Sequence, residues 1–250
     1  MNWKKLAAEL FPLGSMITEQ DDFLSGTGQV IVEYGTVTIA VIGTCNHAPI
    51  GVEIALAQAR AVLQTVREHP GRAILLLVDT QGQRLRHRDE MLGINSYMAH
   101  LGKCIDLARN QGHQIIALVY DQALSGGFIT SGLMADSCHA LPGATIRVMG
   151  LPAMARITKV AEERLTELAR SNPVFAPGPE NYLRMGGLQA IWEGDLAAHL
   201  ANALRDCHAG DRRSALGLAR GGRHLAQPVI NAILTGGPLS RAHAQAHVAG

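Results

Sequence analysis

The sequence has no marked excess of charge of either sign, because 22 Lys and Arg side chains stand against 21 Asp and Glu. It also has no long stretch in which basic residues interleave with aromatic ones. A surface for nucleic acids needs clustered positive charge to meet the phosphates. We therefore expect this protein to bind neither DNA nor RNA.

Paired cysteines and metal-binding motifs are also missing. The cysteines stand far apart in the chain and form no Cys-x-x-Cys motif, at Cys45, Cys104, Cys138 and Cys207. No His-Glu-x-x-His motif occurs, and His243 and His247, four residues apart, lie in a tail rich in Ala and His. Zinc sites and redox pairs usually need such spacings. We expect buried free thiols and no metal ion.

No segment reads as a membrane helix or a signal peptide. The most apolar stretch, residues 34–52, has no Lys, Arg, Asp or Glu, but three glycines and Pro49 interrupt it. A membrane helix needs about 20 mostly apolar residues without such breaks. Residues 1–12 carry Lys4, Lys5 and Glu9 and fit an amphipathic helix better than a leader. The expected location is the cytoplasm, with no membrane partner.

The apolar pattern that is present predicts an α/β protein with one core. Residues 30–34 and 37–42 are rich in β-branched side chains and predict a hairpin that turns at Gly35 and Thr36. Spacings of three and four predict helices over residues 51–69 and around residues 98–108. The apolar runs 73–78 and 115–120 predict strands that are covered on both faces. Parallel pairing of these strands follows from the intervening helices.

Beyond Gly150 the pattern becomes mainly helical. Candidate helices cover residues 153–171, 195–208 and 212–218, with joints rich in Pro and Gly between them. We expect three parts: an N-terminal helical segment over residues 1–24, one domain over residues 25–238, and a flexible tail over residues 239–250. A length of 250 residues suits a single core.

Two segments directly after the buried strands could carry chemistry. Residues 79–83 contain Gly82, and residues 121–128 contain Gly126 and Gly127. A backbone without Cβ can approach a ligand closely and leave its N–H pointing at an anion. Two such N–H groups would form an oxyanion hole. The plainer alternative is that these glycines only end a strand and start a helix. No phosphate-binding glycine motif is present.

Basic side chains follow the first of these segments. Arg84, Arg86 and Arg88 could bind a carboxylate, a phosphopantetheine phosphate or an acidic partner. Asp89 and Glu90, immediately downstream, could neutralise part of that charge, which would make the segment an ordinary solvated turn. Both interpretations stay open.

Ser125 could in principle be a nucleophile, with Asp136 and His139 nearby in the sequence. Sequence proximity does not place a base within hydrogen-bond reach, and the Gly-x-Ser-x-Gly elbow is absent. We interpret Ser125 as a turn or helix-capping residue instead.

Four motifs carry a resemblance to a known family. They are Ile42-Gly43-Thr44, residues 77–83, residues 123–128 and residues 148–152. With these motifs the chain resembles, over nearly its whole length, the gamma subunits of biotin-independent malonate decarboxylases, which are similar in fold to one half of the carboxyltransferase of acyl-CoA carboxylases. The resemblance implies a crotonase-like (ClpP/crotonase) ββα superhelix with a helical C-terminal part.

The resemblance also implies an activity, which is release of CO₂ from malonyl attached to an acyl-carrier protein. Catalytic N–H donors would come from Gly82 or Gln83 and from Gly126 or Gly127. Ser125 stands at the first position of what is usually a triple-glycine turn and, with the arginines, would bind substrate. No cofactor would be bound covalently, because the substrate arrives on a phosphopantetheine-type group of its carrier.

The implied partners are a homologous beta subunit, the acyl-carrier protein and an acyl-carrier transferase subunit of the same complex. Two alternatives remain open. One is carboxyl transfer to or from carboxybiotin on the same fold, and the other is a non-catalytic scaffold subunit whose glycine turns are only structural.

Overall fold

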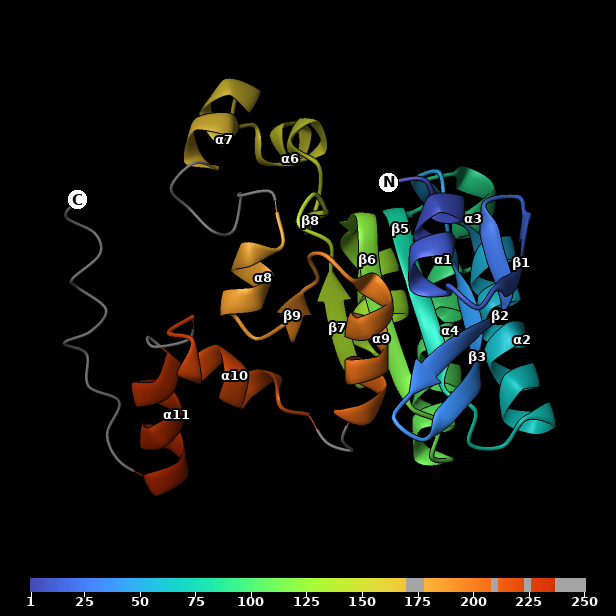
Figure 1. The fold of residues 1–250 in the computed structure, drawn as a ribbon. Coiled ribbons are helices and arrows are strands. Elements are labelled where there is room, and N and C mark those ends of the chain that lie inside the picture. The colour runs from blue at the N-terminus through green and yellow to red at the C-terminus, as the bar shows by residue number, and fades with distance from the viewer. Residues whose placement is uncertain (170–177, 208–210, 223–225, 237–250) are drawn as a thin grey trace.

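A computed structural model of the chain describes residues 1–169, 178–207, 211–222 and 226–236. The described residues form one mixed sheet of nine strands with helices packed around it (Figure 1). The strands are β1 (Ser15–Gln20), β2 (Phe23–Val32), β3 (Gly35–Thr44), β4 (Ala48–Ile50), β5 (Ile74–Gln83), β6 (Ile115–Leu124), β7 (Ser137–Ala140), β8 (Thr145–Arg147) and β9 (Ala190–Ile191).

The helices of the first two thirds of the chain alternate with these strands. They are α1 (Trp3–Leu10), α2 (Val52–Glu68), α3 (His87–Met91), α4 (Ile94–Asn110), α5 (Ser125–Phe128) and the π-helical turn η1 (Ile129–Leu133). The last third is mainly helical, with α6 (Leu151–Thr158), α7 (Glu162–Leu168), α8 (Glu180–Arg184), α9 (Leu196–Arg205), α10 (Arg213–Ala219) and α11 (Ala226–Thr235).

The sheet changes from antiparallel to parallel pairing at β3. Its main strand order is β1-β2-β3-β5-β6-β7-β9, in which β1, β2 and β3 pair antiparallel and the remaining neighbours pair parallel. The short strand β4 pairs with the last residues of β5, and the short strand β8 pairs with the last residues of β6. In the pairing of β5 with β6 the register shifts between Val78 and Thr80, just before these residues. This second group of pairings brings the ends of β5 and β6 together with β4 and β8.

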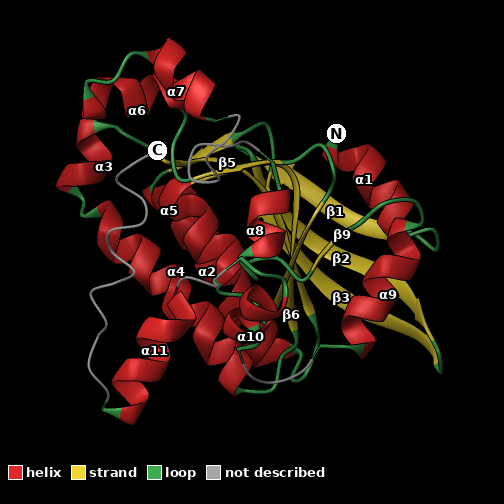
Figure 2. Cartoon of the chain, turned by 90° about the vertical axis from the view of Figure 1, so that its left-hand side faces the viewer, coloured by secondary structure: helices red, strands yellow, loops and turns green. Residues whose placement is uncertain are grey.

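Both faces of the central strands are buried. Along β5, Ile74, Leu76 and Val78 face the cluster that α2 and α4 cover, whereas Leu75 and Leu77 face the cluster that α1 and α9 cover. Figure 2 shows these helices on opposite sides of the sheet. Alternate side chains of a strand point to opposite faces, so a strand covered twice must be apolar throughout. The continuous apolar runs of the sequence have this cause.

The expected α/β layout is confirmed, including the hairpin, both buried strands and helices α2 and α4. The predicted helical segment over residues 1–24 is wrong beyond Leu10, because β1 follows and pairs with β2. The hairpin turns at Glu33 and Tyr34 rather than at Gly35 and Thr36.

Two further boundaries differ from the expectation. Residues 79–83 and 121–124, expected as loops, continue β5 and β6, since β4 and β8 offer them backbone partners. The predicted helix over residues 153–171 is divided into α6 and α7 at Lys159, whose φ of +60° ends a right-handed helix. The predicted tail over residues 239–250 lies outside the described residues.

Among the described helices, none combines the length and the apolar character that crossing a membrane requires.

Candidate functional site

The ends of β5 and β6 meet the start of α5 at one edge of the sheet. Gly82, near the end of β5, has a φ of +98°, and a Cβ added there would lie 2.9 Å from Cβ of Ser125. Only glycine combines this backbone conformation with so close an approach. The structure therefore brings the two glycine segments, residues 79–83 and 121–128, together, with Ser125 of the second segment against Gly82 of the first.

The side chain of Gln83 lies across this junction. Its amide oxygen Oε1 accepts a hydrogen bond from the Ser125 hydroxyl at 3.0 Å and another from the Gly126 N–H at 3.3 Å. Both donors come from the turn that opens α5. Two donors that converge on one carbonyl-type oxygen are the arrangement of an oxyanion hole.

The N–H of Gly82 has a partner within the chain. It donates to Oγ1 of Thr80 at 3.0 Å, and the Thr80 hydroxyl in turn donates to the carbonyl oxygen of Ala48 at 2.7 Å. Thr80 is fully buried, so this chain of bonds fixes the end of β5 against β4. In this conformation the Gly82 N–H points at Thr80. Thr80 was not among the predicted site residues, and the available signal in the sequence was a hydroxyl side chain two residues before Gly82.

Gly127 serves close packing. A Cβ added there would lie 3.0 Å from Cδ1 of Ile50 and from Oγ1 of Thr80, and 3.1 Å from Cα of Gly82. A Cβ added at Gly126 would meet only the end of the Gln83 side chain, at 3.2 Å from its Oε1. The two glycines of the turn therefore differ in their roles. Gly127 allows α5 to pack closely against β4 and β5, whereas Gly126 donates its N–H to Gln83.

Two of the three arginines that were predicted to bind substrate form ion pairs with carboxylates of the same chain. Arg86 binds the buried Asp89 with 2.8 Å between Nε and Oδ2, and Arg88 forms an ion pair with Glu53 of α2. Asp89 also accepts the N–H of Val52 at the start of α2, at 3.3 Å. Among the described residues Arg84 has no ion-pair partner. The hydrogen bond from Arg86, and to a smaller extent the charge of Arg84, lower the pKa of the Asp89 carboxyl.

Ser125, Asp136 and His139 do not form a hydrolase triad. Ser125 bonds Gln83, whereas Nε2 of His139 lies 3.2 Å from Oγ of Ser137. Asp136 accepts bonds from Arg109 and from the N–H of Ile115. Burial lowers the pKa of His139 to about 3, so that its ring is neutral and packs on Trp192 with 4.7 Å between ring centroids. The three residues serve three separate structural contacts.

A second polar group consists of His47, which follows β3, Asp79 of β5 and Asp121 of β6. Asp79 accepts the N–H of His47 at 2.9 Å and the N–H of Gln122 at 3.2 Å, and Nε2 of His47 lies 3.5 Å from Oδ1 of Asp121. Burial raises the pKa of the Asp79 carboxyl. Their potential ligand atoms lie within 4.8 Å of one another, so distance alone would allow a cation. Asp79, however, already accepts two backbone N–H groups.

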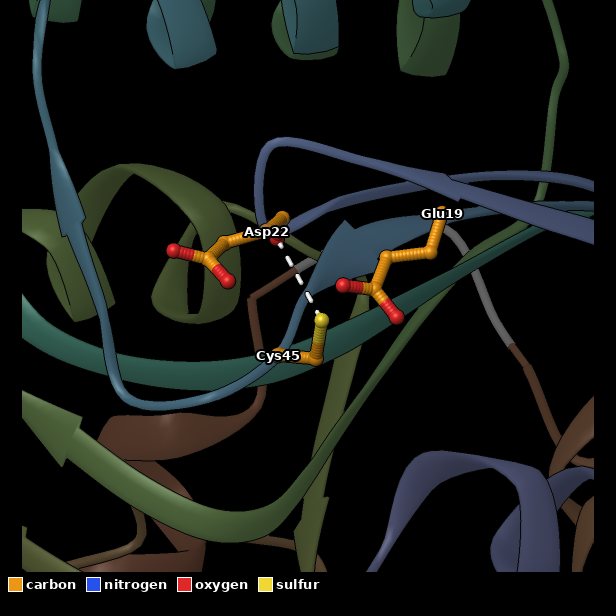
Figure 3. A group of neighbouring side chains, drawn as sticks. All are labelled: Glu19, Asp22 and Cys45. Carbon is orange, nitrogen blue, oxygen red and sulfur yellow. Dashed lines mark hydrogen bonds between the residues drawn. The ribbon is translucent and has the colours of Figure 1, made fainter.

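Glu19, Asp22 and Cys45 form another group of potential metal ligands, with the thiol between the two carboxylates (Figure 3). The thiol donates to the backbone oxygen of Asp22 at 3.7 Å. Burial, followed by the charges of Glu19 and Asp22, raises the pKa of Cys45 to about 12. The carboxylates also accept bonds from Asn46, at 2.8 Å to Asp22 and 3.3 Å to Glu19. These hydrogen bonds connect β1 and the turn after it to the residues that follow β3.

The strand order and the glycine-lined strand ends define a crotonase-like fold of the carboxyltransferase type. The 12S core of transcarboxylase shares this fold with a TM-score of 0.70 over 82% of this chain and 41% of that chain, at 16% identity. The model of the malonate decarboxylase gamma subunit family matches residues 45–236. The chain therefore belongs to the malonate decarboxylase gamma subunit family.

Three comparisons concern proteins that are similar to this chain over most of its length. The malonyl-S-ACP:biotin-protein carboxyltransferase MADD of Malonomonas rubra is 35% identical over 203 residues, which are 72% of this chain and 70% of the relative. A Pseudomonas malonate decarboxylase hetero-tetramer, solved with coenzyme A, matches with a TM-score of 0.74 at 27% identity, over 92% of this chain and 98% of that chain. The Pseudomonas MdcD-MdcE hetero-dimer matches with a TM-score of 0.68 at 25% identity, over 85% and 90%.

Proposed function

We propose that this chain is the gamma subunit of a malonyl-S-acyl-carrier-protein decarboxylase, which releases CO₂ and leaves an acetyl thioester on the carrier. The observation that carries the proposal is the pair of donors that converge on the Gln83 amide oxygen at the start of α5. The membership of the family and the substrate in the name of the Malonomonas relative support the same reaction.

The chemistry asks little of ionisable side chains. When the bond between C2 and the carboxylate breaks, its electron pair forms an enolate whose charge lies mainly on the thioester oxygen. Hydrogen-bond donors already directed at that oxygen lower the barrier, and loss of one donor costs about 10²–10³ in rate. A proton then adds to C2 and gives the acetyl thioester. In the proposal the donors come from the Ser125–Gly127 turn, and the Gly82–Gln83 strand end lies opposite them.

The proposed site works with other subunits. A homologous beta subunit would complete it, as the Pseudomonas MdcD-MdcE hetero-dimer suggests for a relative. The carrier protein would deliver malonyl on a phosphopantetheine-type group, and a transferase subunit would load that carrier. Arg84 is suited to the phosphate of this group, since it follows the Gln83 strand end and has no ion-pair partner in the described part of the chain. A cytoplasmic location belongs to the same proposal.

A second function has specific support, because the Malonomonas relative is named as a carboxyltransferase to a biotin protein. In that reaction the same enolate forms, but the carboxyl group passes to biotin rather than leaving as CO₂. The fold and the donors serve both reactions, which differ in the acceptor of the carboxyl group.

The deciding experiment measures CO₂ release from malonyl-S-carrier by this chain alone, and by this chain co-purified with its beta subunit, with and without avidin. Release that needs both chains and resists avidin supports the decarboxylase. Carboxyl transfer that appears only with a biotinylated carrier, and that avidin stops, supports the second function. Absence of both reactions from the assembled complex would contradict both.

A further inference from the structure

We propose that the hydroxyl of Ser125 and the N–H of Gly126 together form the donor pair for the substrate's enolate oxygen. The amide oxygen of Gln83 takes the place of that oxygen while no substrate is bound. This inference rests on the proposed function and goes further. It makes one of the two donors of the oxyanion hole a side-chain hydroxyl instead of a second backbone N–H.

The convergence of the two donors is the first argument. The Ser125 hydroxyl and the Gly126 N–H reach the same oxygen, at 3.0 Å and 3.3 Å. That oxygen is an amide carbonyl, which is chemically similar to the thioester carbonyl of the substrate. Hydrogen bonds to a charged oxygen are shorter and stronger than those to a neutral one. A developing enolate would therefore be held more tightly by the same pair than the amide of Gln83 is.

The backbone of Ser125 is the second argument. Its φ is +54°, in the left-handed region that a residue with a side chain rarely adopts and that glycine adopts without strain. A serine at such a position in this chain suggests a use for the hydroxyl, since glycine would adopt the turn without strain. The acceptor of that hydroxyl is Gln83, on the facing strand, rather than a backbone group of its own turn.

Among the other predicted donors, the N–H of Gly82 already has a hydrogen-bond partner within the chain. The N–H of Gly82 is engaged by Oγ1 of the buried Thr80, which is itself bonded to the backbone of β4. Freeing this N–H would break a buried network, whereas freeing the Ser125 and Gly126 donors requires only that the end of a half-buried glutamine side chain moves. Gln83 therefore competes with the substrate for the donors and reduces its apparent affinity.

Ser125→Gly is the sharpest test, because it removes the hydroxyl and relieves the backbone strain at the same time. The variant is assayed in complex with the beta subunit, in whichever reaction the wild-type complex performs, since CO₂ release and carboxyl transfer pass through the same enolate. We expect kcat to fall by about 10²–10³-fold, with a thermal midpoint equal to or above that of the wild type. A purely structural serine would give unchanged or higher kcat, and that result would overturn the inference.

Gln83→Glu provides an independent test, because it tethers an anionic oxygen at the same donors. We expect KM for the malonyl thioester to rise at neutral pH, where the new carboxylate holds the donors, and to recover as acid protonates it. Gln83→Ala removes the competing oxygen, so KM should fall below the wild-type value. A KM that is the same in all three proteins across the pH range would contradict the assignment of Gln83.

The outcomes also separate this inference from the function on which it rests. If the wild-type complex is active and Ser125→Gly keeps the full kcat, the assignment of the donor pair is contradicted and the proposed function is not. An assembled wild-type complex without either reaction would remove both.

Discussion

Cys45 shows how burial and neighbouring charge act on a single side chain. Its thiol is fully buried between Glu19 and Asp22, and its pKa is raised to about 12. Thiolate is the reactive form, and an ordinary cysteine has a pKa of about 8.5. At pH 8 we expect alkylation of Cys45 by iodoacetamide to be roughly a thousandfold slower in the folded protein than in guanidinium, as mass spectrometry of the labelled peptides can measure.

Cys207 is the internal comparison for that experiment. It is partly exposed, and its pKa is raised to about 11. We expect it to be labelled before Cys45, and equal labelling of the two thiols in the folded chain would contradict the account of Cys45.

His139 gives a pH-dependent contribution to stability. Burial lowers the pKa of its ring to about 3. Between about pH 3 and pH 6.5 the ring is therefore protonated in the unfolded chain and neutral in the folded chain. Stability from the neutral ring is complete above about pH 6.5 and is lost as pH falls toward 3, with a slope of up to about 1.4 kcal/mol per pH unit. Urea unfolding between pH 4 and 7 measures this slope. His139→Gln should flatten it, and an unchanged slope would assign the effect to other groups.

At the scale of elements, the two glycines of the α5 turn give a matched pair of variants. In Gly127→Ala the new methyl group would meet Ile50, Thr80 and the backbone of Gly82, so α5 must move away from β5. We expect a loss of about 1–3 kcal/mol in unfolding free energy. Gly126→Ala meets only the flexible end of Gln83 and should cost much less. Thermal unfolding of both variants measures the difference, and equal losses would show that the packing at Gly127 is not limiting.

The sequence predicts elements well where burial leaves a pattern of apolar residues. The helices α2 and α4 show their core faces in the spacing of apolar residues, whereas β5 and β6, buried on both faces, are continuous apolar runs. Strand β1 has no such signal, because five of its six residues are exposed and its partner is the edge of β2. The ends of β5 and β6 read as loops, since their strand pairing comes from β4 and β8 rather than from apolar alternation.

The candidate site was predictable in its glycines but not in its contacts. Gly82 and Gly126 follow from their places after buried strands. The bond between Gln83 and Ser125 joins residues 42 positions apart, and the ion pair of Arg88 with Glu53 joins residues 35 positions apart. No local pattern of residues contains such pairings, because they depend on how β5, α2 and α5 are brought together in space.

At the scale of the whole molecule, two arginines connect helix α10 to the segment before β9 and to η1. The guanidinium of Arg220 donates to the carbonyl oxygens of Leu183 and Leu188, each at 2.7 Å, and of Gln189, at 2.8 Å. Arg213 donates to the carbonyl oxygen of Leu133 at the end of η1. Helix α10 is thereby tied to the segment that leads from α8 into β9, and to the helix that follows the candidate site.

Arg220→Met tests this fastening, because methionine keeps much of the apolar stem and loses the donors. Three carbonyl groups lose a charged partner, and each such bond contributes about 1.5–3 kcal/mol. We expect faster hydrogen exchange in residues 182–192 and 213–220, by tenfold or more, with exchange in β5 and β6 unchanged. Arg212→Met, at an exposed position beside the same helix, is the control. If both variants exchange like the wild type, the C-terminal helices are held by other contacts. If β5 and β6 also exchange faster, Arg220 supports the whole sheet rather than its C-terminal edge alone.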